Sequence, residues 1–377
     1  MNSLKNLGLY IHIPFCLSKC RYCDYCSFPH PKHETVEKYL SALYREIEEY
    51  SDGYGEYNVN TVYFGGGTPT LLEADLLCGL LEKLKKHFTV SDGAEITAEC
   101  NPKTADLEYF KKIRSAGFNR LSIGVQSMDE GELKMLGRLH SPDDAKKAFF
   151  DARAAGFENL SADLMFALPS QKPETLMASL KSICALDPDH ISLYGLKIEE
   201  GTYFGRHRDK LELPDEDVEY EMYLACVTKL AKHGYARYEI SNFAKDGKYS
   251  RHNLKYWKRE DYLGLGVAAH SCIGDKRFAN TCDIAKYCCE NRLESLDTIS
   301  KHDILCEKIM LEMRLTEGCD FEILKVEHGE STDVYRDALE GYVRQGFVIK
   351  NGSRFAFSNK GTYISNYILS EILDFER

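Results

Sequence analysis

The sequence lacks the features that would direct a protein to nucleic acid or into a membrane. Its 377 residues include 48 Lys and Arg against 59 Asp and Glu, a formal net charge of −11, so no excess of positive charge is available to hold phosphates. No apolar run is long enough to span a bilayer, and the first residues lead into a strand-like pattern instead of a signal peptide. We therefore expect a cytoplasmic protein with no nucleic-acid partner and no transmembrane segment.

Cysteine, unlike positive charge, is plentiful. The chain has 14 cysteines, and in a reducing compartment so many thiols favour metal binding by thiolates over a framework of disulfides. Apolar residues make up 44% of the sequence, which is enough to bury a large core.

Short apolar runs alternate with amphipathic stretches as far as about residue 198. A helix is predicted across 34–50, and Ser141 followed by Pro142 predicts the start of another. Six strands are predicted, at Leu9–Ile13, Thr61–Phe64, Glu95–Ala98, Leu121–Val125, Leu160–Met165 and His190–Tyr194. Repeated strand–helix alternation predicts an α/β fold with a parallel sheet. Six units fit an open partial (β/α)6 barrel over residues 1–205 as well as they fit a closed eight-fold one.

Two further regions are expected after the barrel. Residues 206–300 are expected to mix helices with aromatic loops. Residues 301–377 read as helices followed by a short hairpin around Asn351-Gly352, a mainly helical C-terminal domain that ends in a winged-helix-like cap. This last region has ten Lys and Arg against fourteen Asp and Glu, so phosphate binding is disfavoured there too.

A cysteine loop follows the first predicted strand. Cys16, Cys20 and Cys23 are spaced by four and three positions, and three thiolates from one loop can hold a [4Fe–4S] cluster while leaving one iron open. The alternative is a structural zinc site with Cys26 as fourth ligand, but no second Cys-x-x-Cys pair follows. The spacing resembles the signature of the radical S-adenosylmethionine (radical SAM) superfamily.

Unusual residues also gather at the ends of the predicted strands, where α/β barrels place their chemistry. The turn Gly65-Gly-Gly-Thr-Pro-Thr70 has bare backbone that would admit a ligand's amino and carboxylate groups, although such a turn taken alone more often serves tight packing between strand and helix. Glu99, Gln126 and Asp163 end the next three strands and could pair with ribose hydroxyls or with neighbouring loops. Arg138, in Gly-Arg-Leu-His, could contact a ligand in the same way or be a solvated helix residue.

Four segments resemble one family within the superfamily. They are Tyr10-x-His-Ile-Pro-Phe-Cys16, Gly65–Thr70, Gly124-Val-Gln-Ser and Asp163-Leu-Met-Phe-Ala-Leu-Pro169, and they resemble the oxygen-independent coproporphyrinogen III oxidases (HemN) and their HemW-type relatives. The resemblance implies a [4Fe–4S] cluster on Cys16, Cys20 and Cys23. It also implies SAM contacts at Tyr10, Tyr22, Gly66, Gly67, Thr68, Glu99, Gln126, Arg138 and Asp163. Two further contact positions of the oxidases, at Lys197 and His270, differ in residue type and are not carried over.

Three departures favour the HemW-type relatives over the oxidases. Tyr25 stands where the oxidases have a fourth cysteine, and their long N-terminal arm is expected to be missing because nine residues precede Tyr10. The segment His252-Asn253-Leu-Lys-Tyr256-Trp257 matches the His-Asn-x-x-Tyr-Trp motif of HemW heme chaperones. Cys26 fits neither group.

The motif implies heme contacts at His252, Asn253, Tyr256 and Trp257. Imidazole is a standard axial ligand of heme iron, and the aromatic side chains offer flat surface to a porphyrin. The alternative is an aromatic loop packed on the barrel with His252 hydrogen-bonded inside it. His270 is a second candidate for the heme ligand.

These observations predict a radical SAM heme chaperone that binds heme and delivers it to heme-accepting proteins, with a homodimer as one possible assembly. In this interpretation the cluster and SAM regulate or organise transfer, and whether the chain is also an enzyme is left open. Two alternatives remain: an oxygen-independent coproporphyrinogen III oxidase, which decarboxylates propionate side chains, and a radical SAM enzyme acting on heme itself.

Overall fold

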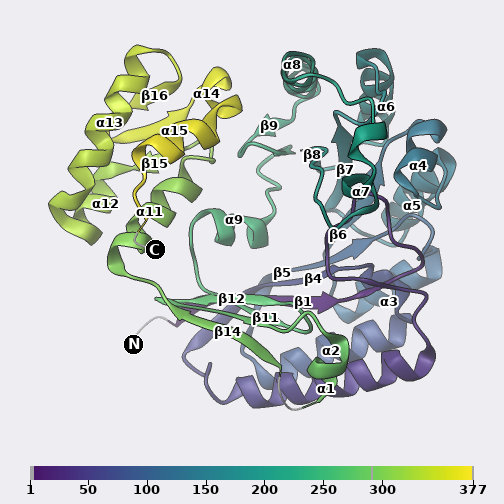
Figure 1. The fold of residues 1–377 in the computed structure, drawn as a ribbon. Coiled ribbons are helices and arrows are strands. Elements are labelled where there is room, and N and C mark those ends of the chain that lie inside the picture. Colours follow the sequence, from purple (N-terminus) through teal and green to yellow (C-terminus); the bar gives the residue numbers. More distant parts are fainter. Residues whose placement is uncertain (1–3, 290–291, 376–377) are drawn as a thin grey trace.

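The computed structural model describes residues 4–289 and 292–375, and a parallel sheet forms its centre. The six predicted strands are confirmed, each within a longer one, and they neighbour one another in chain order: β1 (Lys5–Ile13), β4 (Tyr57–Gly66), β5 (Val90–Cys100), β6 (Arg120–Gln126), β7 (Leu160–Phe166) and β8 (His190–Gly195). All five pairings are parallel. The sheet curves without closing, so the expected partial barrel is confirmed (Figure 1).

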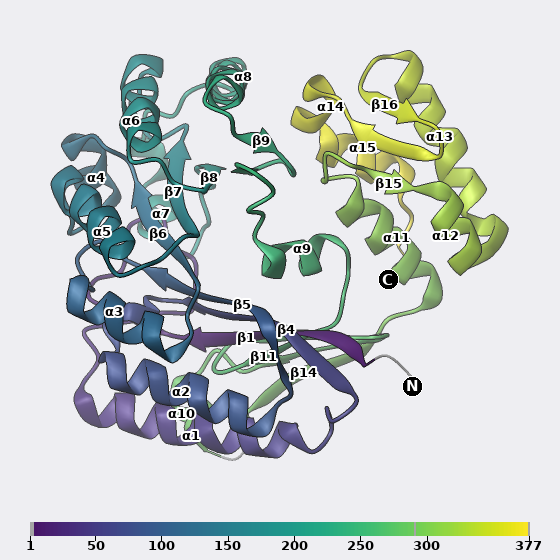
Figure 2. The same ribbon diagram turned by 180° about the vertical axis from the view of Figure 1, so that it is seen from behind.

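Helices cover the outer face of this sheet (Figures 1 and 2): α1 (His33–Ser51), α2 (Ala74–His87), α3 (Leu107–Ala116), α4 (Glu130–Leu136), α5 (Pro142–Ala154) and α6 (Pro173–Ala185). The helix predicted across 34–50 is α1, whose apolar stripe is buried. The predicted start at Ser141 is also confirmed, since Ser141 and Asp144 form a reciprocal capping box at the beginning of α5. Right-handed crossovers of this kind leave the loops after each strand at one end of the barrel.

Residues 206–300 differ from the prediction, because they contain short strands as well as helices and loops. Beyond β1 lie β11 (Tyr262–Leu265), which pairs parallel with it, and then β12 (His270–Ile273), β13 (Lys276–Asn280) and β14 (Leu293–Thr298). Beyond β8 lie β10 (Asn242–Ala244) and β9 (Ala236–Arg237). Strands this short carry little periodicity, and the open edges of the barrel sheet determine their pairing. The division at residues 205/206 stays a prediction.

The α-helices between β8 and the C-terminal part of the chain are α7 (Tyr203–Arg206), α8 (Glu216–Lys232), α9 (Arg251–Trp257) and α10 (Ile284–Cys288). One apolar core runs from Leu7 to Tyr287, so this region packs on the barrel. Figure 1 shows α9 between the barrel and the C-terminal part of the chain.

That C-terminal part has its own apolar core, which includes Leu305, Ile309, Leu339 and Phe355. Its elements are α11 (Lys301–Glu312), β15 (Cys319–Asp320), α12 (Phe321–His328), α13 (Asp333–Arg344), β16 (Val348–Asn351), β17 (Arg354–Phe357), α14 (Asn359–Tyr363) and α15 (Ser365–Ile372). The predicted hairpin is confirmed: β16 pairs with β17, and Gly352 has a φ of 62°. The winged-helix description stays a prediction. Among the described residues, no helix combines the length and apolar character that crossing a membrane requires.

Candidate functional site

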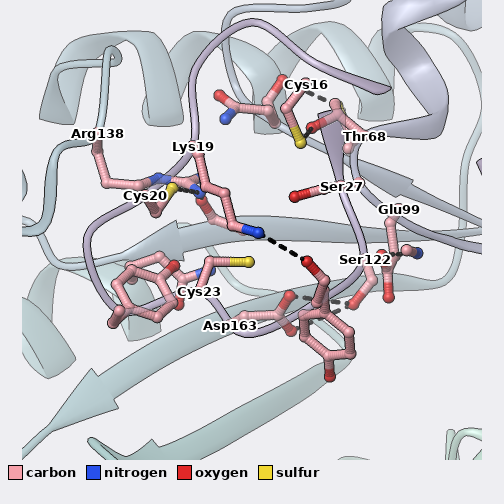
Figure 3. A pocket seen from close by; sticks show the side chains of 18 of the residues that line it. Cys16, Lys19, Cys20, Cys23, Ser27, Thr68, Glu99, Ser122, Arg138 and Asp163 are labelled. Atoms are coloured by element: carbon pink, nitrogen blue, oxygen red, sulfur yellow. Dashed lines mark hydrogen bonds between the residues drawn. The ribbon is translucent and has the colours of Figure 1, made fainter. Parts of the chain in front are cut away.

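A cavity of about 520 Å³ lies at the carboxyl ends of the parallel strands, beneath the cysteine loop (Figure 3). The structure brings together most of the predicted cluster and SAM residues in its wall: Cys16, Tyr22, Cys20, Cys23, Gly66, Gly67, Thr68, Glu99, Gln126, Arg138 and Asp163. Lys197, which was not carried over, also lines it. Tyr10 does not. Its hydroxyl contacts His12 Nδ1 at 3.0 Å, and its ring stacks on Tyr63, a residue of the wall.

The cysteine loop is closed by a short pair of parallel strands, β2 (Phe15–Cys16) and β3 (Phe28–Pro29). Cys16 Sγ lies 3.8 Å from Thr68 Oγ1, and Cys20 Sγ accepts a hydrogen bond from Arg138 Nη1 at 3.5 Å. Burial raises the pKa of the Cys16 and Cys23 thiols in the metal-free chain. The thiolates that bind iron therefore depend on the positive charge of the metal for their stability.

Cys26 is placed differently from the other three cysteines of the loop. Its Sγ donates to the carbonyl oxygen of Cys282 at 3.4 Å, and the residue is not part of the cavity wall. The Cys26 carbonyl oxygen in turn accepts from His12 Nε2 at 2.8 Å. Three thiols facing one cavity fit a [4Fe–4S] cluster with an open iron better than a four-cysteine zinc site.

The glycine turn after β4 supports both interpretations given to it from the sequence. Gly66 has a φ of +109°, and a Cβ there would lie 2.6 Å from Cε1 of His12, so packing alone requires glycine. Gly66 and Gly67 also line the cavity, where their backbone is accessible to a ligand. The Gly66 N–H donates to Glu99 Oε2 at 3.2 Å, which holds the carboxyl group at the cavity.

Two carboxyl groups lie in the cavity wall. Tyr63 Oη donates to Glu99 Oε1 at 2.8 Å, and Ser122 Oγ donates to Asp163 Oδ1 at 3.2 Å. Burial raises the pKa of Glu99 to about 7, and burial also raises the pKa of Asp163. Hydroxyl groups of a bound ligand would offset this burial by donating to the carboxylate oxygens.

Arg138 is not the solvated helix residue that the sequence allowed. It follows Gly137, the left-handed cap of α4, and its Nη2 donates to the Gly124 carbonyl oxygen at 2.6 Å. Gln126, at the end of β6, has a φ of +65°. Such a conformation is uncommon outside glycine and is often found at functional positions.

Sequence reasoning missed several polar residues of this cavity, among them Arg120, Ser122, Ser192 and Tyr194. Arg120 is 2% exposed, and its positive charge partly offsets the rise that burial causes in the pKa of Glu99 and of Asp163. The sequence signal for Arg120 was a positively charged residue at the start of an apolar strand. A buried cation needs anionic neighbours, so such a residue indicates a polar site. The serines could have been found by register, because Ser122 pairs with Glu99 and Ser192 with Asp163 on adjacent strands.

The His-Asn-x-x-Tyr-Trp segment forms α9, and its His252 faces the barrel interior. The imidazole is fully buried, with Nδ1 2.9 Å from Thr61 Oγ1 and Nε2 2.8 Å from Tyr256 Oη. It stacks on Tyr63 with ring centroids 5.2 Å apart. Burial lowers the pKa of His252 to about 3. This is the packed arrangement that the sequence left as the alternative. In it both ring nitrogens are engaged, so ligation of heme would require the ring to leave these partners.

The other two members of the motif face different spaces. Asn253 lines the cavity, whereas Trp257 lines a groove against the C-terminal part of the chain. His270, the second candidate for a heme ligand, is exposed on β12 and lines neither space. The predicted heme contacts are thus not gathered at one surface. Heme contact stays a prediction for each of them.

Comparison with known proteins identifies the family. The radical SAM superfamily model matches residues 10–183, and the HemN C-terminal domain model matches residues 299–364. The chain is 35% identical to heme chaperone HemW of Bacillus subtilis, over 97% of this chain and 98% of the relative. It is 34% identical to heme chaperone HemW of Escherichia coli K12, over 99% of this chain and the whole relative.

A solved structure has the same fold. It is coproporphyrinogen III oxidase (HemN) from Escherichia coli, described as a radical SAM enzyme, with a TM-score of 0.86 and 23% identity over 98% of this chain and 90% of that one. The resemblance read from the motifs is confirmed by the near full-length relatives. The chain therefore belongs to the HemW family of radical SAM proteins.

Proposed function

We propose that this chain binds heme and transfers it to heme-accepting proteins, with a [4Fe–4S] cluster and SAM in the barrel cavity. Support comes from near full-length similarity to relatives named heme chaperone HemW. The position of α9 carries the proposal: Asn253 lines the cavity, and one turn later Trp257 lines the groove at the C-terminal part. A helix in contact with both spaces provides a physical connection through which the cavity can influence heme held next to Trp257.

Membership of the radical SAM superfamily implies the cluster and SAM. When bound, the cluster supplies the electron by which radical SAM proteins cleave SAM. In this chain Cys16, Cys20 and Cys23 would hold the iron, and the bare backbone of Gly66 and Gly67 would admit the methionyl end of SAM. Carboxyl oxygens of Glu99 and Asp163, which lie in the same wall, would accept hydrogen bonds from hydroxyl groups. In the proposed chaperone these ligands regulate or organise heme transfer.

The second candidate function is that of an oxygen-independent coproporphyrinogen III oxidase. The fold shared with the Escherichia coli enzyme favours it. Two features of the chain favour the chaperone instead: Tyr25, in the cavity wall, stands where the oxidases have a fourth cysteine, and His252-Asn253-Leu-Lys-Tyr256-Trp257 matches the motif of the heme chaperones. The third candidate, a radical SAM enzyme that acts on heme, would use the same cavity and would convert heme into a different tetrapyrrole.

One anaerobic experiment separates these functions. The reconstituted protein is incubated with hemin and then with an apo-acceptor, such as an apo-cytochrome b, against free hemin at the same concentration. In parallel it is incubated with coproporphyrinogen III, SAM and a reductant. We expect a stable heme complex, heme transfer to the acceptor, and no decarboxylated porphyrin.

Steady formation of protoporphyrinogen IX would refute the chaperone and establish the oxidase. Loss of intact heme with a new tetrapyrrole product would establish the third candidate. Light scattering on the same samples tests whether the chain forms a homodimer, one of its possible assemblies.

A further inference from the structure

A second open space lies between the end of α9 and the C-terminal part of the chain. It is a groove of about 740 Å³ that shares no wall residue with the SAM cavity. Its wall is formed by Trp257, by Met310, Leu311 and Arg314 at the end of α11, and by Asn366, Leu369, Ser370, Leu373, Asp374 and Phe375 around α15. Both its volume and its mainly apolar wall are typical of sites for cofactors and drug-sized molecules.

The side of α11 that meets this groove carries a repeated set of potential metal ligands. His302, Cys306 and Met310 follow one another at four-residue steps, so they share one side of the helix, and Arg314 continues the spacing just beyond its end. Histidine, cysteine and methionine are the side chains that most often ligate heme iron. Of these three, Met310 lies in the groove wall.

The other two potential ligands lie earlier in the helix and already have partners. His302 Nε2 lies 2.7 Å from the Asp374 carbonyl oxygen, and the fully buried Cys306 Sγ lies 3.3 Å from Tyr335 Oη. Met310 is only partly buried against the C-terminal core. A neutral thioether is a weak ligand, which suits a protein that must release its heme.

Polar groups in the groove match an anionic ligand. Trp257 Nε1 and Arg314 Nε are both buried and have no hydrogen-bond partner among the described residues. The Arg314 guanidinium carbon lies 5.0 Å from the centre of the Trp257 ring, so the two donors are neighbours. Buried donors without partners are costly, and a carboxylate entering the groove would satisfy both after a small side-chain movement.

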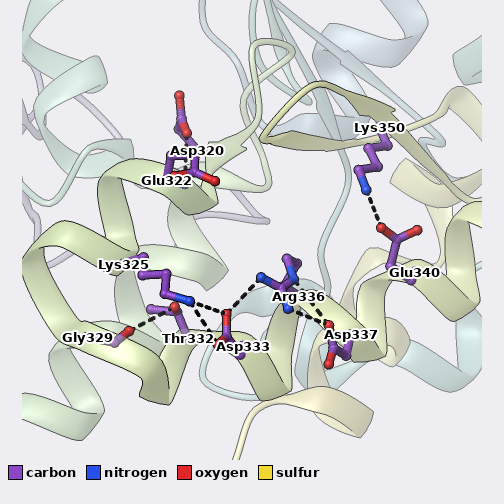
Figure 4. A network of polar contacts seen from close by, with 10 residues as sticks. All are labelled: Asp320, Glu322, Lys325, Gly329, Thr332, Asp333, Arg336, Asp337, Glu340 and Lys350. Atoms are coloured by element: carbon purple, nitrogen blue, oxygen red, sulfur yellow. Dashed lines mark hydrogen bonds and ion pairs between the residues drawn. The ribbon is translucent and has the colours of Figure 1, made fainter.

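Some other cations of the same unit are paired with carboxylates, whereas Arg314 is not paired within the described part of the chain. Lys325 lies 3.0 Å and Arg336 2.8 Å from the carboxylate oxygens of Asp333, in the network drawn in Figure 4. Over the described ranges, by contrast, no carboxylate lies within ion-pair distance of Arg314. The charge of Arg314 helps to lower the pKa of buried Glu239, whose pKa is raised mainly by burial. The carboxyl group of Asp374, also in the wall, already accepts from Tyr335 Oη at 2.6 Å.

We infer that this groove is the heme-binding site, with Met310 as an iron ligand, Arg314 holding a propionate and the Trp257 indole against the porphyrin. The inference rests on the proposed function and assigns its heme-binding site to this groove. Heme is flat, mainly apolar and carries two carboxylates, and the groove offers it an aromatic face, aliphatic side chains and one unpaired cation. It also explains why the motif helix contacts heme through Trp257, whereas His252 is buried beneath the SAM cavity.

The test is a hemin titration of the full-length protein, followed by the Soret band and by fluorescence of Trp257, the chain's one tryptophan. The variants are Met310→Leu, which keeps the side-chain volume, and Arg314→Gln, which removes the charge. Met177→Leu on α6 and Arg344→Gln on α13 are the matched controls, because neither residue lines the groove. Circular dichroism and thermal unfolding confirm that each variant is folded.

We expect Met310→Leu to shift the Soret band of the complex, and Arg314→Gln to raise the dissociation constant at least tenfold, while both controls behave as wild type. If the wild type binds no heme, the proposed function itself fails. If it binds heme and both groove variants match it in spectrum and affinity, the groove is not the site and the proposed function still stands. A spectral change in His252→Ala alone would place the iron at α9 and would overturn the inference in the same way.

Discussion

Replacing His252 by alanine tests whether this residue is a structural member of the barrel or a heme ligand. In the structure its two ring nitrogens contact the hydroxyl groups of Thr61 and Tyr256 at 2.9 and 2.8 Å. The ring also stacks on Tyr63, which donates to Glu99 in the SAM cavity. His252→Ala should therefore destabilise the fold and leave the spectrum of bound heme unchanged.

The magnitude follows from what the substitution leaves behind. Thr61 is 1% exposed, so bulk solvent does not reach its hydroxyl group, which loses a partner, and the Tyr256 hydroxyl group loses one as well. A buried polar group without its partner costs about 1–3 kcal/mol. With the cavity left by the ring, the free energy of unfolding should fall by roughly 3–5 kcal/mol.

Urea unfolding of the metal-free protein under reducing conditions measures this loss, and the Soret band of the hemin complex measures ligation. His233→Ala is the control: His233 is exposed at the end of α8, and its removal should change the unfolding free energy by less than about 0.5 kcal/mol. If His252→Ala lowers the free energy of unfolding by less than about 1 kcal/mol and also alters the heme spectrum, the structural role is refuted.

Three further predictions concern the cavity and its surroundings. Cys20→Ala should abolish the visible absorption of the cluster and the binding of about four irons per chain. Cys26→Ala should keep both and still bind SAM, because the Cys26 sulfur contacts Cys282 instead of the cavity. Iron analysis after anaerobic reconstitution measures the outcome, and a Cys26→Ala protein without iron would contradict the three-cysteine site. Gly66→Ala should weaken SAM binding in equilibrium dialysis, because a Cβ would meet the His12 ring at 2.6 Å and the φ of +109° disfavours alanine. A Gly66→Ala protein that binds SAM with the affinity of the wild type would show that this turn does not contribute to the SAM site. Burial lowers the pKa of His252 in the folded protein to about 3, below its ordinary value of 6.5, so the unfolded chain takes up the proton first as the pH falls. The contribution of His252 to stability is therefore complete above pH 6.5 and decreases by about 1.4 kcal/mol for each pH unit below it, down to about pH 3. The urea midpoint of His252→Gln should therefore depend less steeply on pH than that of wild type between pH 6.5 and 5, and parallel profiles would show that His252 is not buried in its neutral form.

The sequence by itself determined the barrel strands and the cluster loop, because both depend on residues close together in the chain. Short apolar runs were sufficient to place the six strands, and the structure extends them by one to seven residues each. The spacing of Cys16, Cys20 and Cys23 restricts the three thiols to one short loop wherever that loop lies. The hairpin at Gly352 is equally local, since its turn requires a positive φ.

Only the tertiary structure decided how distant segments meet. The strands of residues 236–298 are two to six residues long, and they exist because β1 and β8 offer open edges. The surroundings of the α9 side chains also come from contacts between distant segments: His252 contacts Thr61, whereas Trp257 contacts Arg314. One motif of six letters thus divides between a buried network, the SAM cavity and a groove. No periodicity within the motif predicts this division, because Thr61, which contacts His252, is 191 positions away and Arg314, which contacts Trp257, is 57 positions away.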